Sequence, residues 1–115
     1  MKKNNKQNYL DNIPMKNQAH SWEEEDEIVT IHMENKGIYN KIAQKFFGSP
    51  KVSHVALDEL GSFVWKQIDG QRSIYQIGQL VNEEFGTNAE PLYERLSKYF
   101  YNLNSTKFIT FKVKG

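Results

Sequence analysis

The histidines are the residues of this chain whose chemistry best suits metal binding or proton transfer. There are three, His20, His32 and His54. His32 and His54 fall in segments with strand-like sequence, so the two can be neighbours in a sheet. Two imidazoles without a carboxylate or thiolate at ligand spacing make a poor metal site. We therefore expect ordinary sheet or surface histidines and no bound metal.

The acidic run from Glu23 to Glu27 is a second candidate for chemistry, because five consecutive carboxylates attract cations. A site for a hard metal ion needs oxygen ligands that converge on one point. Consecutive residues of a strand point to opposite faces, so these side chains would diverge. The run is typical of a solvated hairpin turn.

No arrangement of residues typical of catalysis is present. The chain has no cysteine, which excludes disulfides, thiolate metal sites and a cysteine nucleophile. It also lacks the phosphate-binding, zinc-protease and nucleophile-elbow motifs GxxxxGKS/T, GxGxxG, HExxH and GxSxG. Serines and threonines are scattered, without a nearby histidine in a familiar arrangement. We predict that the protein is not an enzyme and uses no cofactor.

Length and charge limit the remaining classes of function. The chain has 115 residues, of which 38% are hydrophobic, and a formal net charge of +1. This is enough for one ordinary domain with one core, and it lacks the basic excess usual in nucleic-acid binders. The basic start, residues 1–8, is not followed by an apolar segment, and no run of about 18 apolar residues occurs. These features predict a cytoplasmic protein without a membrane span.

Two parts are expected, a flexible N-terminal arm over residues 1–19 and one domain over residues 20–115. The apolar side chains of residues 9–14 can pack on that domain as an extended arm. The domain is expected to begin with an antiparallel sheet. Its hairpin has strands His20–Glu23 and Ile28–Met33 around a charged turn, Glu24–Glu27.

The next segment, Gly37–Phe47, carries apolar residues at helical spacing and contains Lys41 and Lys45, with Lys36 directly before it. It predicts a short basic amphipathic helix, and Val52–Leu57 then predicts a third strand. Three longer helices and a short terminal strand follow, at Asp58–Ile68, Ser73–Phe85, Asn88–Leu103 and Phe108–Phe111.

Capping residues mark where these helices begin. Asp58 and Asn88 can cap the first and third helices, and Ser73 with Gln76 forms a capping box for the second. The predicted fold class is therefore α+β. A small antiparallel sheet precedes a three-helix bundle, in an order similar to a winged helix-turn-helix.

The order of these signals resembles the PqqD family. In that family a strand leads into Leu-Asn/Asp and a helix, followed by Asp-Gly, a Ser/Thr cap and an isoleucine. The matching residues here are Leu57-Asp58, Asp69-Gly70, Ser73 and Ile77. The resemblance continues through the last helix to Phe108-Ile109, and covers about residues 52–110.

The resemblance implies a non-catalytic peptide chaperone of natural product biosynthesis, a RiPP recognition element. Such a domain binds the leader of a ribosomally synthesised precursor peptide and delivers it to a modifying enzyme, commonly a radical S-adenosylmethionine (SAM) enzyme. The leader adds as a strand to the third β-strand, here Val52, Ser53, His54, Val55, Ala56 and Leu57. It also lies against the third helix, where the matching stripe is Leu92, Arg95, Leu96 and Tyr99.

The members of that stripe differ in how specifically they indicate binding. Leu92 and Leu96 fit the core equally well, so Arg95 and Tyr99 are the more distinctive contacts. Arg95 can pair with an acidic side chain of the leader.

Two other functions stay open. The helix order also fits a winged-helix DNA-binding transcriptional regulator, although the charges of the third helix, Glu90, Glu94, Arg95 and Lys98, sum to zero. The chain could also be an accessory subunit that stabilises an enzyme and binds no leader. The helix at residues 37–47 departs from the usual short turn of the family and could dock the partner enzyme. The oligomeric state stays open, because an exposed strand edge can also pair two copies.

Overall fold

The computed structural model describes residues 8–34 and 52–113. The chain divides into two compact units, one of Gln18–Ser62 and one that combines Met1–Asn17 with Phe63–Gly115. The basic helix predicted at residues 37–47 lies outside the described residues. No helix in the described ranges is long and apolar enough to cross a bilayer.

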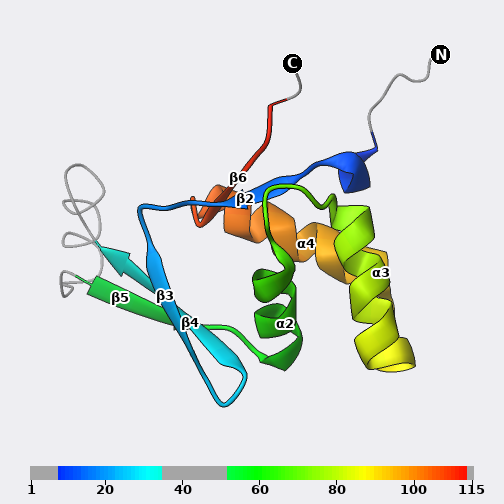
Figure 1. Ribbon diagram of the computed structural model, residues 1–115, viewed down its shortest axis with the longest axis horizontal. Coiled ribbons are helices and arrows are strands. Elements are labelled where there is room, and N and C mark those ends of the chain that lie inside the picture. Colours follow the sequence, from blue (N-terminus) through cyan, green and yellow to red (C-terminus); the bar gives the residue numbers. More distant parts are fainter. Residues whose placement is uncertain (1–7, 35–51, 114–115) are drawn as a thin grey trace. The chain divides into compact units, whose positions relative to one another are not determined.

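The unit of residues 18–62 is built on a three-stranded antiparallel sheet (Figure 1). Its strands are β3 (Ser21–Glu25), β4 (Ile28–Glu34) and β5 (Val52–Ala56), in the order β3-β4-β5. The predicted hairpin and third strand are therefore confirmed.

The hairpin turn is tighter than the sequence suggested. Strand β3 continues through Glu25, and only Asp26 and Glu27 form the turn. Both have positive φ, 52° and 68°. A two-residue turn with this left-handed backbone matches the right-handed twist of the flanking strands, which is why the strands extend into the acidic run.

The side chains of β4 alternate between a buried and a more accessible face of the sheet. Val29, Ile31 and Met33 are at most 8% exposed, whereas Thr30 and His32 between them are half-buried. This alternation is what a period of two requires of a sheet with one covered face.

A buried serine joins β4 to the start of helix α2 (Glu59–Gln67). The hydroxyl of Ser62, which is fully buried, accepts from the Val29 N–H at 2.8 Å and donates to the Leu57 carbonyl at 3.3 Å. Asp58 caps the helix as predicted, since its carboxylate accepts from the Gly61 N–H at 2.7 Å. Ser62 therefore satisfies a backbone donor that no strand partner reaches.

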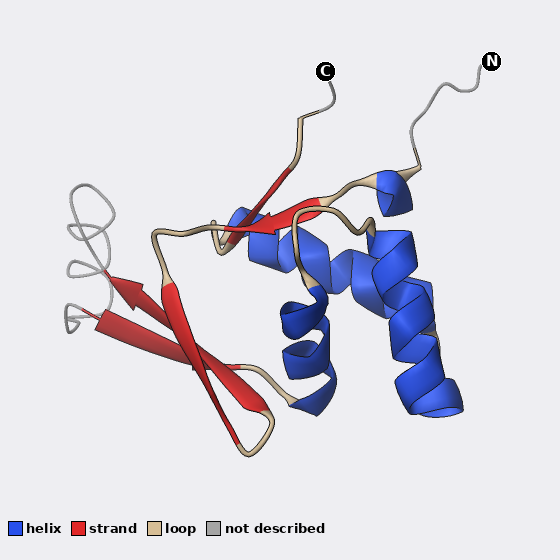
Figure 2. Cartoon of the chain, viewed as in Figure 1, coloured by secondary structure: helices blue, strands red, loops and turns tan. Residues whose placement is uncertain are grey.

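The other unit holds the helices and a two-stranded ribbon (Figure 2). The 3-10 helix η1 (Tyr9–Asp11) and strand β2 (Pro14–Lys16) come from the N-terminal segment, part of the arm predicted to be flexible. Strand β2 pairs antiparallel with β6 (Ile109–Phe111), which confirms the terminal strand. Helix α3 (Ile74–Phe85) is fixed to the N-terminal segment through a bond from the Ile74 N–H to the Asn12 carbonyl.

The core of this unit comes from α2, α3 and helix α4 (Leu92–Ser105). Four apolar residues of α4 are buried: Leu92, Leu96, Phe100 and Leu103. The capping box at the start of α3 is present, with bonds of 2.9 and 3.1 Å between Ser73 and Gln76. Trp65, 1% exposed, is a large core residue that the sequence pattern did not single out.

Asn88 does not cap α4, and this prediction is wrong. Residues Gly86–Ala89 form a separate 3-10 turn, η2, closed by a bond from the Glu90 N–H to the Thr87 carbonyl. Glu90 is extended, with φ −72° and ψ 146°. A residue before proline is disfavoured in the helical region, so the helix starts only after Pro91.

The small antiparallel sheet and the three helices confirm the α+β class. The likeness to a winged helix-turn-helix stays a prediction.

Replacing Ser62 by alanine should lower the free energy of unfolding by about 1 to 3 kcal/mol, because the Val29 N–H would be left buried without an acceptor. Urea unfolding followed by circular dichroism measures this change. The matched control is Ser105→Ala, at an exposed position of α4, which should stay within about 0.5 kcal/mol of the parent. Equal effects of the two substitutions would contradict the role given to the Ser62 hydroxyl.

Candidate functional site

The free edge of β5 is the first candidate surface. Among the described residues, β5 pairs with β4 and with no other strand. Within that same part of the chain, no strand pairs with the backbone groups on its other side, which is the arrangement of an edge strand. The predicted strand Val52–Leu57 is observed as Val52–Ala56, and Leu57 follows it.

The hydrogen-bond register identifies which backbone groups face outward. The N–H of Leu57 donates to the Val29 carbonyl at 2.9 Å, so this opposed pair is of the bonded type. Bonded and non-bonded pairs alternate along an antiparallel ladder. Ser53 and Val55 therefore bond toward β4, and the N–H and C=O groups of Val52, His54 and Ala56 point away from it. The two-residue turn gives the same register, because it directs the backbone N–H and C=O groups of Val29 and Ile31 toward β5.

Over residues 54–57, the more accessible side chains are those of the outward-bonding residues. His54 and Ala56 are exposed, whereas Val55 and Leu57 are half-buried. A peptide added at this edge would meet an imidazole and a small methyl group on one face of the extended sheet.

His54 forms a close pair with His32, directly opposite on β4. Their Nδ1 atoms are 2.7 Å apart, and the rings are nearly perpendicular, at 86°. At this distance one ring donates its N–H and the other accepts with its lone pair. The Nε2 atom of His32 lies 3.7 Å from a carboxylate oxygen of Glu23 on β3. The sequence-based expectation that the two histidines are sheet neighbours is confirmed.

The described residues around these histidines do not complete a metal centre. In residues 8–34 and 52–113, no group of three or more His, Cys, Asp or Glu side chains is placed to hold a metal ion. The Glu23 carboxylate lies near Nε2 of His32, whereas His54 contacts the other ring nitrogen, Nδ1. The arrangement is suited to orienting an imidazole through its far nitrogen.

Helix α4, in the other unit, holds the second predicted surface. Leu96 is fully buried and Leu92 is 6% exposed, so both serve the core. Arg95 is exposed, and its guanidinium donates to the Asn88 carbonyl at 3.2 Å. Tyr99 is half-buried, with its ring edge-on to that of Phe100. Of the predicted stripe, Arg95 and Tyr99 are the residues that reach the surface.

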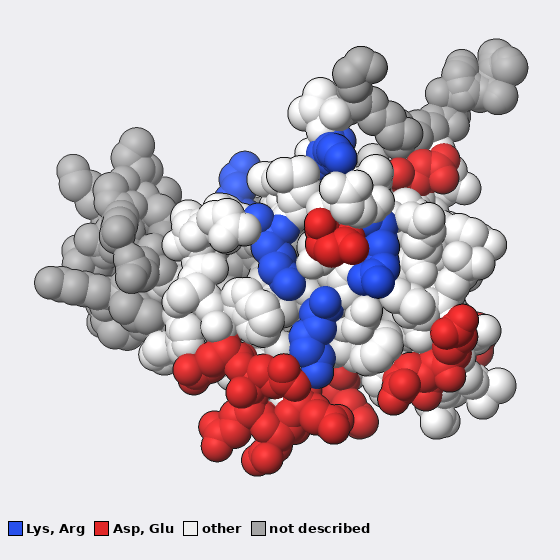
Figure 3. All heavy atoms as spheres, in the orientation of Figure 1, with Lys and Arg blue, Asp and Glu red and all other residues white. Residues whose placement is uncertain are grey.

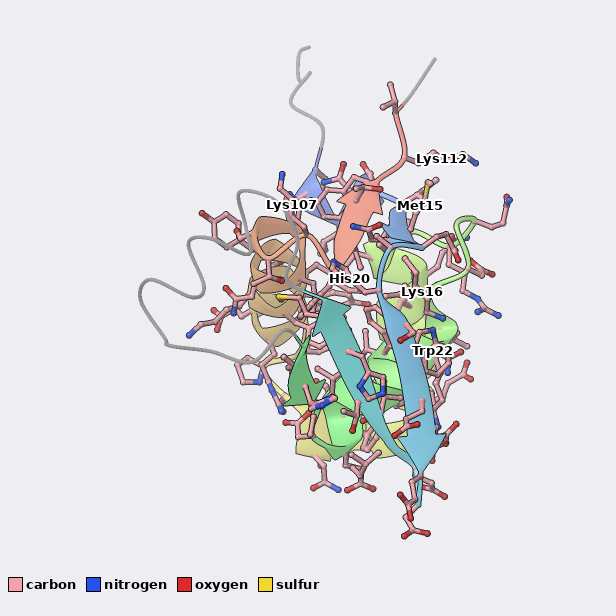
Figure 4. The ribbon with its side chains drawn as sticks, turned by 90° about the vertical axis from the view of Figure 1, so that its left-hand side faces the viewer. Met15, Lys16, His20, Trp22, Lys107 and Lys112 are labelled. Carbon is pink, nitrogen blue, oxygen red and sulfur yellow. The ribbon has the colours of Figure 1, made fainter. Side chains whose placement is uncertain are left out.

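Charge is distributed unevenly over each unit. Figure 3 shows the acidic side chains of the β3–β4 hairpin as one group at its tip. In the helical unit, Lys16 on β2 and Lys112 just after β6 are among the basic side chains (Figure 4). The ammonium of Lys16 lies 5.5 Å from the centre of the Trp65 ring. Burial lowers the pKa of Lys16, and nearby Asp69 opposes that shift.

One surface feature was not singled out from the sequence. An open hollow of about 610 Å³ lies between α3 and the start of α4, and its lining includes Tyr75, Glu90 and Tyr93. Its position depends on where α4 begins, and the sequence pattern placed that start three residues too early.

Comparison with known proteins adds one finding. The family model described as Coenzyme PQQ synthesis protein D (PqqD) matches residues 27–109. The matched range contains β5 and α4 entire. No curated protein and no solved structure matches the chain.

The hydrogen bond between the two imidazoles should appear as a coupling energy. In a double-mutant cycle with His32→Ala and His54→Ala, we expect about 1 kcal/mol of coupling in the free energy of unfolding. The comparison cycle pairs His32→Ala with Glu23→Ala. It should give less than about 0.5 kcal/mol, because that pair is longer and exposed to solvent. Equal coupling in the two cycles would contradict the direct bond.

Proposed function

The chain belongs to the PqqD family, and on that premise we propose that it captures the leader of a ribosomally synthesised precursor peptide by strand addition to β5. It then delivers the leader to a modifying enzyme, which we propose is a radical SAM enzyme. Members of the family are non-catalytic accessory proteins that bind precursor peptides. The proposal gives this chain the same place, that of a peptide chaperone in natural product biosynthesis.

The observation that carries the proposal is the outward row of backbone groups on β5. Val52, His54 and Ala56 offer their N–H and C=O groups on the side away from β4. An extended peptide could pair with all three and so complete the unfilled side of the ladder. Backbone pairing of this kind supplies affinity, and neighbouring side chains supply selectivity.

Selectivity would come from two groups of side chains. On β5, the imidazole of His54 is held by His32 and stands beside the added strand. On α4, Arg95 and Tyr99 are proposed as further contacts, with Arg95 pairing an acidic residue of the leader. The bond from Arg95 to the Asn88 carbonyl uses one nitrogen of the guanidinium and restricts its orientation. The remaining donors of the guanidinium suit a carboxylate.

Affinity purification of the tagged protein from its native cells is the direct test of function. Bound peptides, proteins and DNA would be identified together. Recovery of a short precursor peptide supports leader capture, and co-recovery of a radical SAM enzyme supports delivery to that class of partner. Recovery of an enzyme and never a peptide would replace the proposal by a stabilising subunit. Recovery of specific DNA, with steeply salt-dependent binding, would replace it by a transcriptional regulator.

Replacing Ala56 by proline should weaken binding of the identified leader about tenfold, because one outward donor is lost. The sheet should survive, since proline is tolerated on an edge strand where its missing N–H would face solvent. Fluorescence anisotropy with a labelled synthetic leader measures the affinity. The control Ala56→Ser keeps the N–H and should bind like the parent. Unchanged affinity in the proline variant would show that the leader does not pair at this position.

Replacing Arg95 by alanine should weaken leader binding by about two- to fivefold, the range of an exposed ion pair. Reversal of the charge in Arg95→Glu should weaken it further. Lys98→Ala removes the same charge from an exposed position one turn along α4 and serves as the matched control. If the Lys98 and Arg95 variants lose equal affinity, general charge attraction accounts for the effect and the contact is not specific.

A further inference from the structure

The hollow between α3 and the start of α4 is formed within the helical unit and uses no residue of β5. Its aromatic lining is a pair of tyrosines, one from each helix. The rings of Tyr75 and Tyr93 stack nearly parallel, at 16°, with centres 5.7 Å apart. Tyr75 is 47% exposed, so a large aromatic surface is open to a partner.

A glycine in α3 makes room for this pair. A Cβ atom added at Gly78 would lie 2.5 Å from the Tyr93 ring and 3.0 Å from Leu96. Glycine in the middle of a helix makes the helix less stable than alanine would. Here its absent side chain allows the Tyr93 ring to lie directly against the helix. The Tyr93 ring thus lies between α3 and the open space of the hollow, stacked on Tyr75.

The charged residues that line the hollow are all acidic. Glu83, Glu90 and Glu94 contribute to it, and no lysine or arginine does. In the described part of the chain, none of these three carboxylates forms an ion pair with a basic side chain. The pKa of Tyr93 is raised by burial, and further by Tyr75 and Glu90, as expected in a region of negative potential.

The end of α3 adds to this potential. Glu83 lies in the last turn of the helix, and that turn contains no basic residue. The C-terminal end of a helix carries partial negative charge, which favours a cation and disfavours a carboxylate. A positively charged group from outside the chain would therefore be attracted by the helix end and the carboxylates together.

We propose that this hollow is a docking site for an arginine-bearing basic segment of a partner protein. A guanidinium can stack on a tyrosine face and also form paired hydrogen bonds with a carboxylate. A lysine ammonium can lie over a tyrosine ring, but it lacks the planar fork that forms paired hydrogen bonds with a carboxylate. The hollow is open and its lining is as polar as it is apolar, whereas sites for small molecules are mostly enclosed and apolar. A protein segment is therefore the better occupant.

Synthetic peptides test the proposal on the whole protein. The probe is a fluorescein-labelled peptide of alternating glycine and arginine, with three arginines. We expect saturable binding that is at least about fivefold tighter than that of the same peptide with lysine, and about tenfold tighter than with uncharged citrulline. Equal affinity for the arginine and citrulline peptides, no measurable binding of the arginine peptide, or equal competition by spermine would overturn the proposal.

Variants locate the binding on the protein. The double variant Glu90→Gln with Glu94→Gln should weaken arginine-peptide binding at least about fivefold, and Tyr75→Ala about threefold. Tyr75→Phe keeps the ring and should bind like the parent. Glu84→Gln removes one charge from an exposed residue of α3 that does not line the hollow, and should change affinity less than twofold. Should Glu84→Gln weaken binding as much as Glu90→Gln alone, the site assignment is wrong.

Discussion

Every backbone donor and acceptor of a sheet needs a partner, and this requirement organises the unit of residues 18–62. Strand β4 is satisfied on both sides, by β3 and β5, and where the ladder ends Ser62 accepts the Val29 N–H. Within the described chain, β5 has a strand partner for its backbone N–H and C=O groups on one side only. Water can hydrate its outward groups, but a peptide strand can replace that water without distorting the sheet. The proposed function rests on this difference between β4 and β5.

The sequence predicted local features well where one side chain decides the backbone. Asp58 and the pair Ser73 and Gln76 cap their helices as expected, because a cap needs only residues within one turn. The start of α4 was misplaced, since Asn88 is a good cap by type but the restriction that Pro91 places on Glu90 prevails. The burial of Trp65 was not predicted, because the buried face of a helix can be wider than the narrow apolar stripe that a helical repeat defines.

The candidate surfaces were predictable in part. The resemblance to the PqqD family pointed to β5 as the strand that pairs with the leader, and to Arg95 as a more distinctive contact on α4. Residue types could not separate Leu92 and Leu96 from the binding stripe, because an apolar residue at that spacing serves core and pocket equally well. The close contact between His32 and His54 could be predicted only from the register of β4 against β5, and these two strands are separated by a long connection. Register depends on turn geometry and on which face is buried, and no local motif reports it.

The hollow beside Tyr75 shows why an error in a helix boundary can hide a surface. Had α4 begun at Asn88, Glu90 and Pro91 would lie within its first turn. They instead form an extended approach to the helix, and with Tyr93 they line the hollow. Two features of α3 weaken that helix on its own, Gly78 in its middle and Glu83 at its negative end. Both residues contribute to the same hollow, since Gly78 leaves room for the aromatic pair and Glu83 supplies a carboxylate. The positive charge of an arginine-bearing partner would offset the repulsion between Glu83 and the helix end, and its guanidinium would stack on the tyrosines that Gly78 accommodates.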